Sequence, residues 1–326
     1  MEPEEKSRRN LSKFCQMNLS RFLAGRTPFC CSQLYLACLG RLYYFNHPQE
    51  QELIRQTIRR VFGEHLEQSA LQELFRRTFA GILTHYQEKL FLAYAPENRV
   101  KNYLTRRLQV QGAEKLQQAL AVGRGVILVT GHFGAVEFLP AALSLNGYPA
   151  AIVVRPQTKE LAASLARRAA LIDLTLIFPE NGKVLPAALR ALREGRILIT
   201  EADEFEMWRP GESPTLNFLG FQIPADRTLE VLQKRSGAPF MTALVRREPK
   251  RQYVVDIASP ATLSAGQKVG RQCLQVLETA IYRTPEQWYQ WKEFGKVIAA
   301  RPDGRKPAAS PANLPPYLIK PAYANA

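Results

Sequence analysis

Two side chains able to perform acid–base chemistry lie close together in the segment GHFGAVE, residues 131–137. An imidazole becomes a competent general base when a carboxylate fixes its tautomer and stabilises its charged form. His132 and Glu137 are five residues apart, which on a continuous helix would separate them by about 140°. They can meet only if His132 lies in a loop and Glu137 in the first helical turn, with Gly131 and Gly134 giving the backbone freedom to turn. The pattern therefore indicates a base that deprotonates a substrate hydroxyl, and the alternative at this point is a helix-capping histidine beside a surface glutamate.

The residues around this motif predict a strand before it and a helix after it. Residues 126–130 form an apolar run, and residues 135–145 have helical character. Further apolar runs alternate with helical stretches at residues 151–154, 175–178, 197–200, 240–245 and 253–257. Repeated alternation of this kind predicts an α/β sheet with helices on its faces. Ligands of such sheets bind beyond the carboxyl ends of the strands, which is where the motif lies.

Two more charged residues follow predicted strands and should lie at the same edge of the sheet. Arg155 comes after the run 151–154, and Asp203 comes after the run 197–200. We expect Arg155 to bind a phosphate or stabilise an oxyanion, with a surface cation as the alternative. Asp203 is expected to orient Arg155 or the substrate, with a turn-capping role as the alternative.

Composition divides the chain into three parts. Residues 1–48 form an N-terminal helical segment, residues 49–300 form the main domain, and residues 301–326 are Pro-rich and predicted to be disordered. Within the main domain, residues 49–120 are expected to be helical because apolar residues recur there at helical spacing. Residues 121–300 are expected to form the α/β part, because short apolar runs alternate there with helical stretches.

A formal net charge of +15 predicts an anionic partner, which could be a nucleic acid, an anionic lipid or an acidic protein. The basic residues are scattered as pairs, as at Arg59-Arg60 and Arg106-Arg107, and the sequence shows no nucleic-acid-binding motif with stacking aromatics. A basic nucleic-acid-binding protein is therefore kept only as a distant alternative. A Gly-x-Ser-x-Gly elbow, a Walker A motif and a His-Glu-x-x-His motif are likewise missing from the sequence.

The membrane relationship is predicted to be peripheral. The most apolar stretch, residues 27–45, is bounded by Arg26 and broken by Arg41, and its residues 29–45 are too short and too interrupted to span a bilayer. We expect an interfacial helix, with packing on the helices that follow as the alternative, and neither a transmembrane span nor a signal peptide. The five cysteines are odd in number and form no C-x-x-C pair, which argues against a disulfide framework or a zinc site of that kind.

From about residue 52 to residue 296 the chain resembles the lauroyl/myristoyl acyltransferases of lipid A biosynthesis. Six blocks follow the family's order: GHFGAVE at 131–137, VRP at 154–156, ITEADE at 199–204, NFLG at 217–220, RSGAP at 235–239, and PEQW at 285–288. Two blocks depart from the family pattern. Ala135-Val136 replaces the usual Asn-Trp before the glutamate, and Glu204 stands where Gln or His follows the aspartate.

The resemblance implies a glycerolipid-acyltransferase-like α/β sheet flanked by helices, with a helical N-terminal region. It implies His132 and Glu137 as catalytic residues, with no metal and no cofactor. The residues that it assigns to substrate binding are Arg155, Asp203, Gly131, Gly134 and Gly220.

By the same resemblance, the enzyme transfers a fatty acyl chain to a lipid hydroxyl, with a lipid A precursor as the expected acceptor. The donor would be a thioester of acyl carrier protein or CoA, and an acidic carrier protein suits a basic surface. The expected location is the cytoplasmic face of the cell inner membrane, where the protein would be peripheral or monotopic. Another glycolipid, a phospholipid or an aminolipid stays open as the acceptor.

Overall fold

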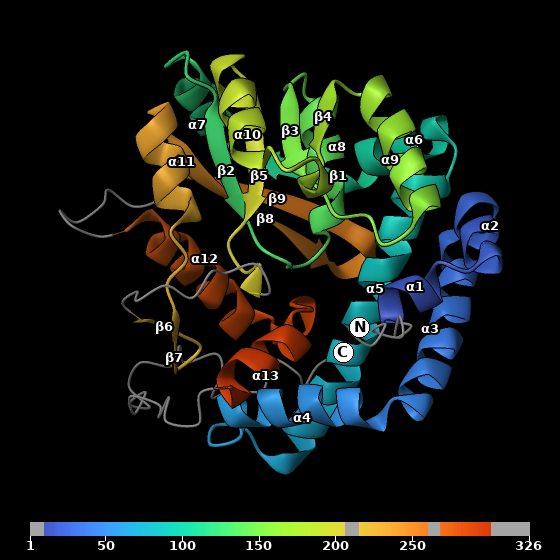
Figure 1. The fold of residues 1–326 in the computed structure, drawn as a ribbon. Coiled ribbons are helices and arrows are strands. Elements are labelled where there is room, and N and C mark those ends of the chain that lie inside the picture. Colours follow the sequence, from blue (N-terminus) through green and yellow to red (C-terminus); the bar gives the residue numbers. More distant parts are fainter. Residues whose placement is uncertain (1–9, 206–214, 260–267, 301–326) are drawn as a thin grey trace, which may run out of the picture.

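The computed structural model describes residues 10–205, 215–259 and 268–300 (Figure 1). Within these ranges seven strands form one sheet, in the order β1-β9-β8-β2-β5-β3-β4. The strands are β1 (Leu108–Gln111), β2 (Val126–Thr130), β3 (Ala150–Val153), β4 (Leu174–Ile177), β5 (Ile197–Glu201), β8 (Phe240–Glu248) and β9 (Gln252–Ala258). Strands β8, β2, β5, β3 and β4 run parallel, whereas β9 is antiparallel to β8. The predicted α/β class is confirmed.

Strand β2 is buried along its whole length because helices cover both faces of the sheet. Val126 and Leu128 pack into one hydrophobic cluster, while Ile127 and Val129 pack into the other. This division follows from the alternation of side chains along a strand. A strand buried on both faces reads as a continuous apolar run, which is why the sequence predicted it.

The described chain from residue 10 to residue 107 is mainly helical and packs against the sheet domain. The helices are α1 (Leu11–Cys15), α2 (Asn18–Arg26), α3 (Phe29–Asn46), α4 (Pro48–Phe62), α5 (Gln68–Tyr94) and α6 (Glu97–Arg107). In Figure 1, α5 runs from the base of the molecule up to the sheet, and it contacts α2, α3 and the turns that flank the functional motif. Among the described residues, none of the helices is long and apolar enough to cross a membrane.

The remaining helices alternate with the strands as expected. They are α7 (Ala113–Leu120), the 3-10 turn η1 (Val136–Phe138), α8 (Leu139–Leu145), α9 (Lys159–Leu171), α10 (Val184–Arg193), α11 (Thr228–Ser236), α12 (Val269–Arg283), the 3-10 turn η5 (Pro285–Gln287) and α13 (Trp291–Ala299). Helix α13 lies against α4, far from it in sequence (Figure 1). The predicted tail, residues 301–326, lies outside the described residues.

Two elements differ from the expectation. Strand β1 interrupts the stretch 49–120, which was expected to be entirely helical, and pairs in parallel with β9. Its four residues are half exposed at the sheet edge, so they carry little of the apolar pattern that marks an inner strand. After β5 the chain forms a hairpin of β6 (Thr215–Phe218) and β7 (Phe221–Pro224), which is not among the strands expected from the apolar runs. Leu219 and Gly220 form its turn with φ of +51° and +79°, and a two-residue turn with both φ positive is favoured in hairpins.

Candidate active site

The motif residues lie at the carboxyl end of the central strand, as predicted. His132 is in the loop that follows β2, and Glu137 is in the short turn η1. Strand β5 is the neighbour of β2, and Thr130 pairs with Glu201 at the end of both strands. The residues after the two strands therefore share one edge of the sheet, and this places the segment 201–204 beside His132.

Asp203 contacts the imidazole of His132 at Nδ1. The ring nitrogen Nδ1 lies 3.0 Å from Asp203 Oδ1, and the backbone N–H of His132 donates to both carboxylate oxygens at 3.1 Å. The indole Nε1–H of Trp288 donates to Oδ2 at 2.7 Å. Asp203 is fully buried and is thus an acceptor with fixed position. The contact keeps the proton on Nδ1 and leaves Nε2 as the basic nitrogen.

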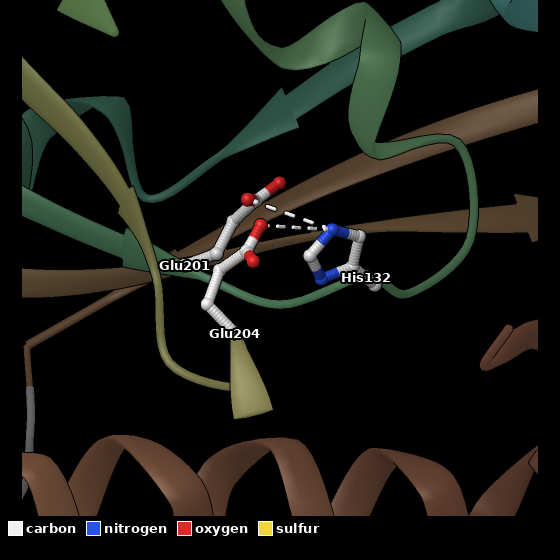
Figure 2. A group of neighbouring side chains, drawn as sticks. All are labelled: His132, Glu201 and Glu204. Carbon is white, nitrogen blue, oxygen red and sulfur yellow. Dashed lines mark ion pairs between the residues drawn. The ribbon is translucent and has the colours of Figure 1, made fainter. Parts of the chain in front are cut away.

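Two glutamates approach the other ring nitrogen, as Figure 2 shows. His132 Nε2 lies 3.5 Å from Glu201 Oε2 and 3.5 Å from Glu204 Oε1. Burial alone would lower the pKa of His132, but the carboxylates of Glu201, Asp203 and Glu204 outweigh it and raise that pKa to about 10. Burial, assisted by Glu204 and opposed by His132, raises the pKa of Glu201 to about 8. Without substrate, the ring is therefore charged at neutral pH, and it becomes a base only when these carboxylates are drawn away or neutralised.

Glu137 has partners other than His132. Its Oε1 lies 3.2 Å from Lys89 Nζ and 3.6 Å from His85 Nε2, both on α5. Burial, together with Lys89 and Arg247, holds the pKa of His85 well below its usual range, so this imidazole is neutral. In the part of the chain that the structure describes, no hydrogen bond or ion pair joins Glu137 to His132. The two residues nevertheless line the same cavity, and the catalytic role of Glu137 stays a prediction.

The ring of Tyr289 lies between the two histidines. It stacks on His85 with a centroid distance of 3.8 Å and meets His132 edge-on at 5.2 Å. The backbone N–H of Tyr289 also donates to the carbonyl of His132 at 3.2 Å. This contact fixes the position of the loop relative to the C-terminal turn.

The loop of the motif is held by backbone contacts that only glycine permits at one position. Gly134 has a φ of +58°, and a Cβ there would lie 1.8 Å from the Val245 carbonyl oxygen. Its N–H donates to the Gln287 carbonyl at 2.8 Å, and the N–H of Ala135 donates to Val245 at 2.9 Å. A Cβ at Gly131 would lie 2.7 Å from a methyl group of Leu277. The two glycines expected to bind substrate thus allow the close packing of this loop.

A buried ion pair fixes the same loop from the other side. Arg247 on β8 donates to both carboxylate oxygens of Glu88 at 2.9 and 2.8 Å, and to the Gly134 carbonyl at 2.7 Å. The Glu88 side chain has no exposed surface. The side-chain amide of Gln287 bonds to both the N–H and the carbonyl of Arg247. Helix α5, β8 and η5 therefore converge on Gly134.

A cavity of about 960 Å³ opens beside this edge of the sheet. His132, Glu137, Glu201, Glu204 and the exposed Arg155 line it. Apolar lining residues extend away from His132 and include Val100, Leu104, Ala141, Ile152, Leu165 and Leu176. Asp203, Gly131, Gly134 and Gly220 are not among the lining residues. Asp203 is connected with the cavity through its contact with His132, and Gly220 lies in the hairpin turn.

Sequence reasoning missed several residues of the site. Glu201 and Glu204 were read only as parts of a block, although their position after a strand parallel to β2 was the signal that could have found them. Trp288 was identified only as part of the PEQW block, and no contact with the other site residues was predicted for it. His85 and Lys89 were not assigned to the site, because nothing local connects α5 with Glu137.

A sequence model of the bacterial lipid A biosynthesis acyltransferases matches residues 15–293. No curated protein shows significant similarity to the chain. The matched range includes every residue of the site described above, from His85 on α5 to Tyr289 after η5. Because the match extends over most of the chain and agrees with the geometry at the end of β2, the chain belongs to the bacterial lipid A biosynthesis acyltransferase family.

Proposed function

We propose that this acyltransferase moves a fatty acyl chain from a thioester of acyl carrier protein or CoA to a hydroxyl of a lipid, with a lipid A precursor as the acceptor. The observation that carries the proposal is the His132 imidazole, held at Nδ1 by buried Asp203, with Nε2 facing a large cavity. An apolar side of this cavity fits an acyl chain, and cations on its lining, among them Lys89, Lys101 and Arg155, fit a phosphorylated acceptor.

In the proposed reaction His132 is the general base. The acceptor hydroxyl displaces the two glutamates from Nε2. Loss of these contacts lowers the pKa of the ring, and the Nε2 proton leaves to solvent, so that Nε2 has a free lone pair. Nε2 then takes the hydroxyl proton while the oxygen attacks the thioester carbonyl carbon. The carbon–sulfur bond breaks, and the proton passes from Nε2 to the leaving sulfur. Asp203 stabilises the imidazolium between these two transfers, which is the orienting role that the sequence assigned to Glu137.

The acceptor class is tested by lipid analysis. A strain that lacks the gene should accumulate a lipid one acyl chain short of the wild-type product, and mass spectrometry of total lipids identifies it. A shortened lipid A precursor supports the acceptor proposed here. A shortened aminolipid or phospholipid would instead favour the alternative acceptors, for which the carboxylates of Glu201 and Glu204 offer contacts to an ammonium group.

Acyl transfer is expected to be direct, with no acyl-enzyme. The ring contacts of His132 are to carboxylates and to Tyr289, and no described Ser, Thr or Cys side chain hydrogen-bonds to it. No nucleophile is therefore placed for activation. After incubation with donor thioester alone, intact-mass spectrometry should show unmodified protein. A stoichiometric acyl adduct that disappears when one serine, threonine or cysteine is substituted would contradict direct transfer.

Membrane association is proposed to use an apolar surface on α2 and α3. Leu34, Leu42 and Phe45 on α3 are 68%, 54% and 83% exposed, and Phe22 on α2 is 51% exposed. The opposite side of α3 packs into the core. Large apolar side chains on a soluble surface mark a binding region, and the cytoplasmic face of the inner membrane is the proposed partner. Arg26 and Arg41 on the same two helices suit anionic lipid headgroups.

Removing part of this surface should weaken binding to lipid. Leu42→Ser with Phe45→Ser is expected to lower co-sedimentation with anionic liposomes several-fold, because inserted apolar area is lost. Salt should release part of the wild-type protein, since each basic residue near an anionic surface contributes about 1 kcal/mol. Val231→Ser, an exposed apolar residue on α11, is the control. Equal sedimentation of the double variant and the control would contradict this surface. Point substitutions are preferable to deleting residues 1–45, since buried Leu36, Leu39 and Tyr43 belong to the core.

A further inference from the structure

Three side-chain atoms converge on one point in the cavity beside His132. His132 Nε2 lies 3.5 Å from an oxygen of Glu201 and 3.5 Å from an oxygen of Glu204, and the three ligand atoms all lie within 4.8 Å of one another. A distance of 3.5 Å is too long for a good N–H···O hydrogen bond. It is close to the spacing of about 3.3–3.4 Å between two ligands of a tetrahedral zinc ion with bonds of about 2.0–2.1 Å.

The surroundings of the ring match those of a metal-binding histidine. A ligating imidazole donates its other ring N–H to a carboxylate, which fixes the tautomer and turns the free lone pair toward the metal. Asp203 takes this position at Nδ1, and Trp288 and the His132 backbone hold its carboxylate in place. Figure 2 shows Glu201 and Glu204 on the Nε2 side of the ring. Their carboxylate oxygens and the imidazole nitrogen form a set of ligand atoms that zinc accepts.

Charge also favours a divalent cation at this point. Among the described residues, neither Glu201 nor Glu204 forms an ion pair with a lysine or an arginine, and both pair with His132. The ring is charged in the free protein, and metal binding releases protons because ligands bind in their deprotonated forms. With two ionised carboxylates and a neutral imidazole, the three ligands carry a formal charge of −2. A divalent ion therefore neutralises the group without needing a proton on the ring.

We propose that His132, Glu201 and Glu204 bind Zn²⁺ reversibly, with the fourth position open to the cavity, and that the bound ion inhibits acyl transfer. The inhibition rests on the proposed function, because zinc occupies the Nε2 lone pair that would take the acceptor proton. The three groups all line the cavity, so the ion and the acceptor hydroxyl compete for the same place. The rate of acyl transfer would then fall as the concentration of free Zn²⁺ rises, because the ion binds the catalytic base His132.

Zinc binding can be measured without any acyl transfer. The full chain would carry Cys30→Ser and Cys31→Ser, since two adjacent exposed thiols are a competing zinc site. Titration with Zn²⁺ against a chromophoric chelator should give one equivalent bound. Glu201→Gln and Glu204→Gln should each weaken the affinity at least ~10-fold, the lower end of the loss seen when even an outer partner of a ligand is removed. Glu137→Gln, which removes a carboxylate from the same cavity, should bind zinc as the parent does.

The metal site is wrong if the parent does not bind zinc. It is also wrong if Glu201→Gln and Glu204→Gln both bind zinc with the affinity of the parent. Circular dichroism of the variants identifies loss of fold, and two single variants keep the comparison valid if one fails to fold. In the acylation assay, zinc should reduce the parent rate, and a chelator should restore it. If transfer depends on His132 but zinc does not bind, the metal site fails and the proposed function stands. If zinc binds but no lipid is acylated, the proposed function fails and the metal site stands.

Discussion

His132→Ala should abolish acyl transfer while the protein stays folded. The substitution removes the nitrogen that takes the acceptor proton, and a positioned general base contributes about 10²–10⁴-fold to a rate. The loop keeps its shape because its backbone bonds to Gln287 and Val245 do not involve the imidazole. The measurement is the initial rate of transfer from a purified acyl thioester to the acceptor, followed by mass spectrometry.

His65→Ala serves as the control for this experiment. It also removes an imidazole, from the turn after α4, and His65 does not line the cavity. Its rate should match that of the wild-type protein. If purified His132→Ala turned over at a near-normal rate with unchanged circular dichroism, the general-base mechanism would be wrong.

Asp203→Asn should reduce turnover nearly as severely, by about 10²–10⁴-fold. Asparagine keeps the size of the buried side chain. It has only one carbonyl oxygen, however, whereas the ring Nδ1–H and the backbone N–H of His132 both need an acceptor. The Nδ1–H form of His132 then loses its support, and the imidazolium loses a buried counter-charge. The rate constant for turnover should fall far more than the KM, because Asp203 does not line the cavity.

Glu137→Gln is the matched comparison for Asp203→Asn. It removes one carboxylate charge from the same site, but Glu137 contacts Lys89 and His85 rather than the reacting ring. We expect it to slow transfer less than Asp203→Asn does. A larger loss at Glu137, with Asp203→Asn nearly normal, would return the orienting role to the glutamate of the sequence motif.

Much of the sheet edge around the site could be predicted because it follows from short, distinct sequence patterns. Strand β2 is an apolar run ended by Gly131, and β5 is another ended by charged residues, so both their existence and their common edge followed from the sequence. Asp203 and Arg155 were placed at that edge for the same reason. Glu137 lies in the short turn η1, the position required for a contact with His132, but among the described residues its contacts are to Lys89 and His85.

The partners within the site could not be predicted from the sequence. Whether Asp203 or Glu137 contacts the ring depends on a few ångströms at the end of the sheet, and His-x4-Glu spacing permits either. Lys89 comes from α5 and Trp288 from the turn after α12, and no local pattern relates them to residues 131–137. Strand β1 was missed because a short, half-exposed edge strand has neither the apolar run of β2 nor a clear alternation.

The contacts of Trp288 with Asp203 and of Gln287 with Gly134 mean that the site is complete only after residues 285–288 have been synthesised. His132 leaves the ribosome long before the chain that completes its surroundings, because translation proceeds from the N-terminus. Helices α2 and α3 emerge earlier still, so a nascent chain presents its apolar surface before it has an oriented base. A chain released early, before residue 285, would keep the whole GHFGAVE loop and lack the bonds that hold it. We therefore expect chains that end before residue 285 to lack acyl-transfer activity, even where their apolar surface is complete.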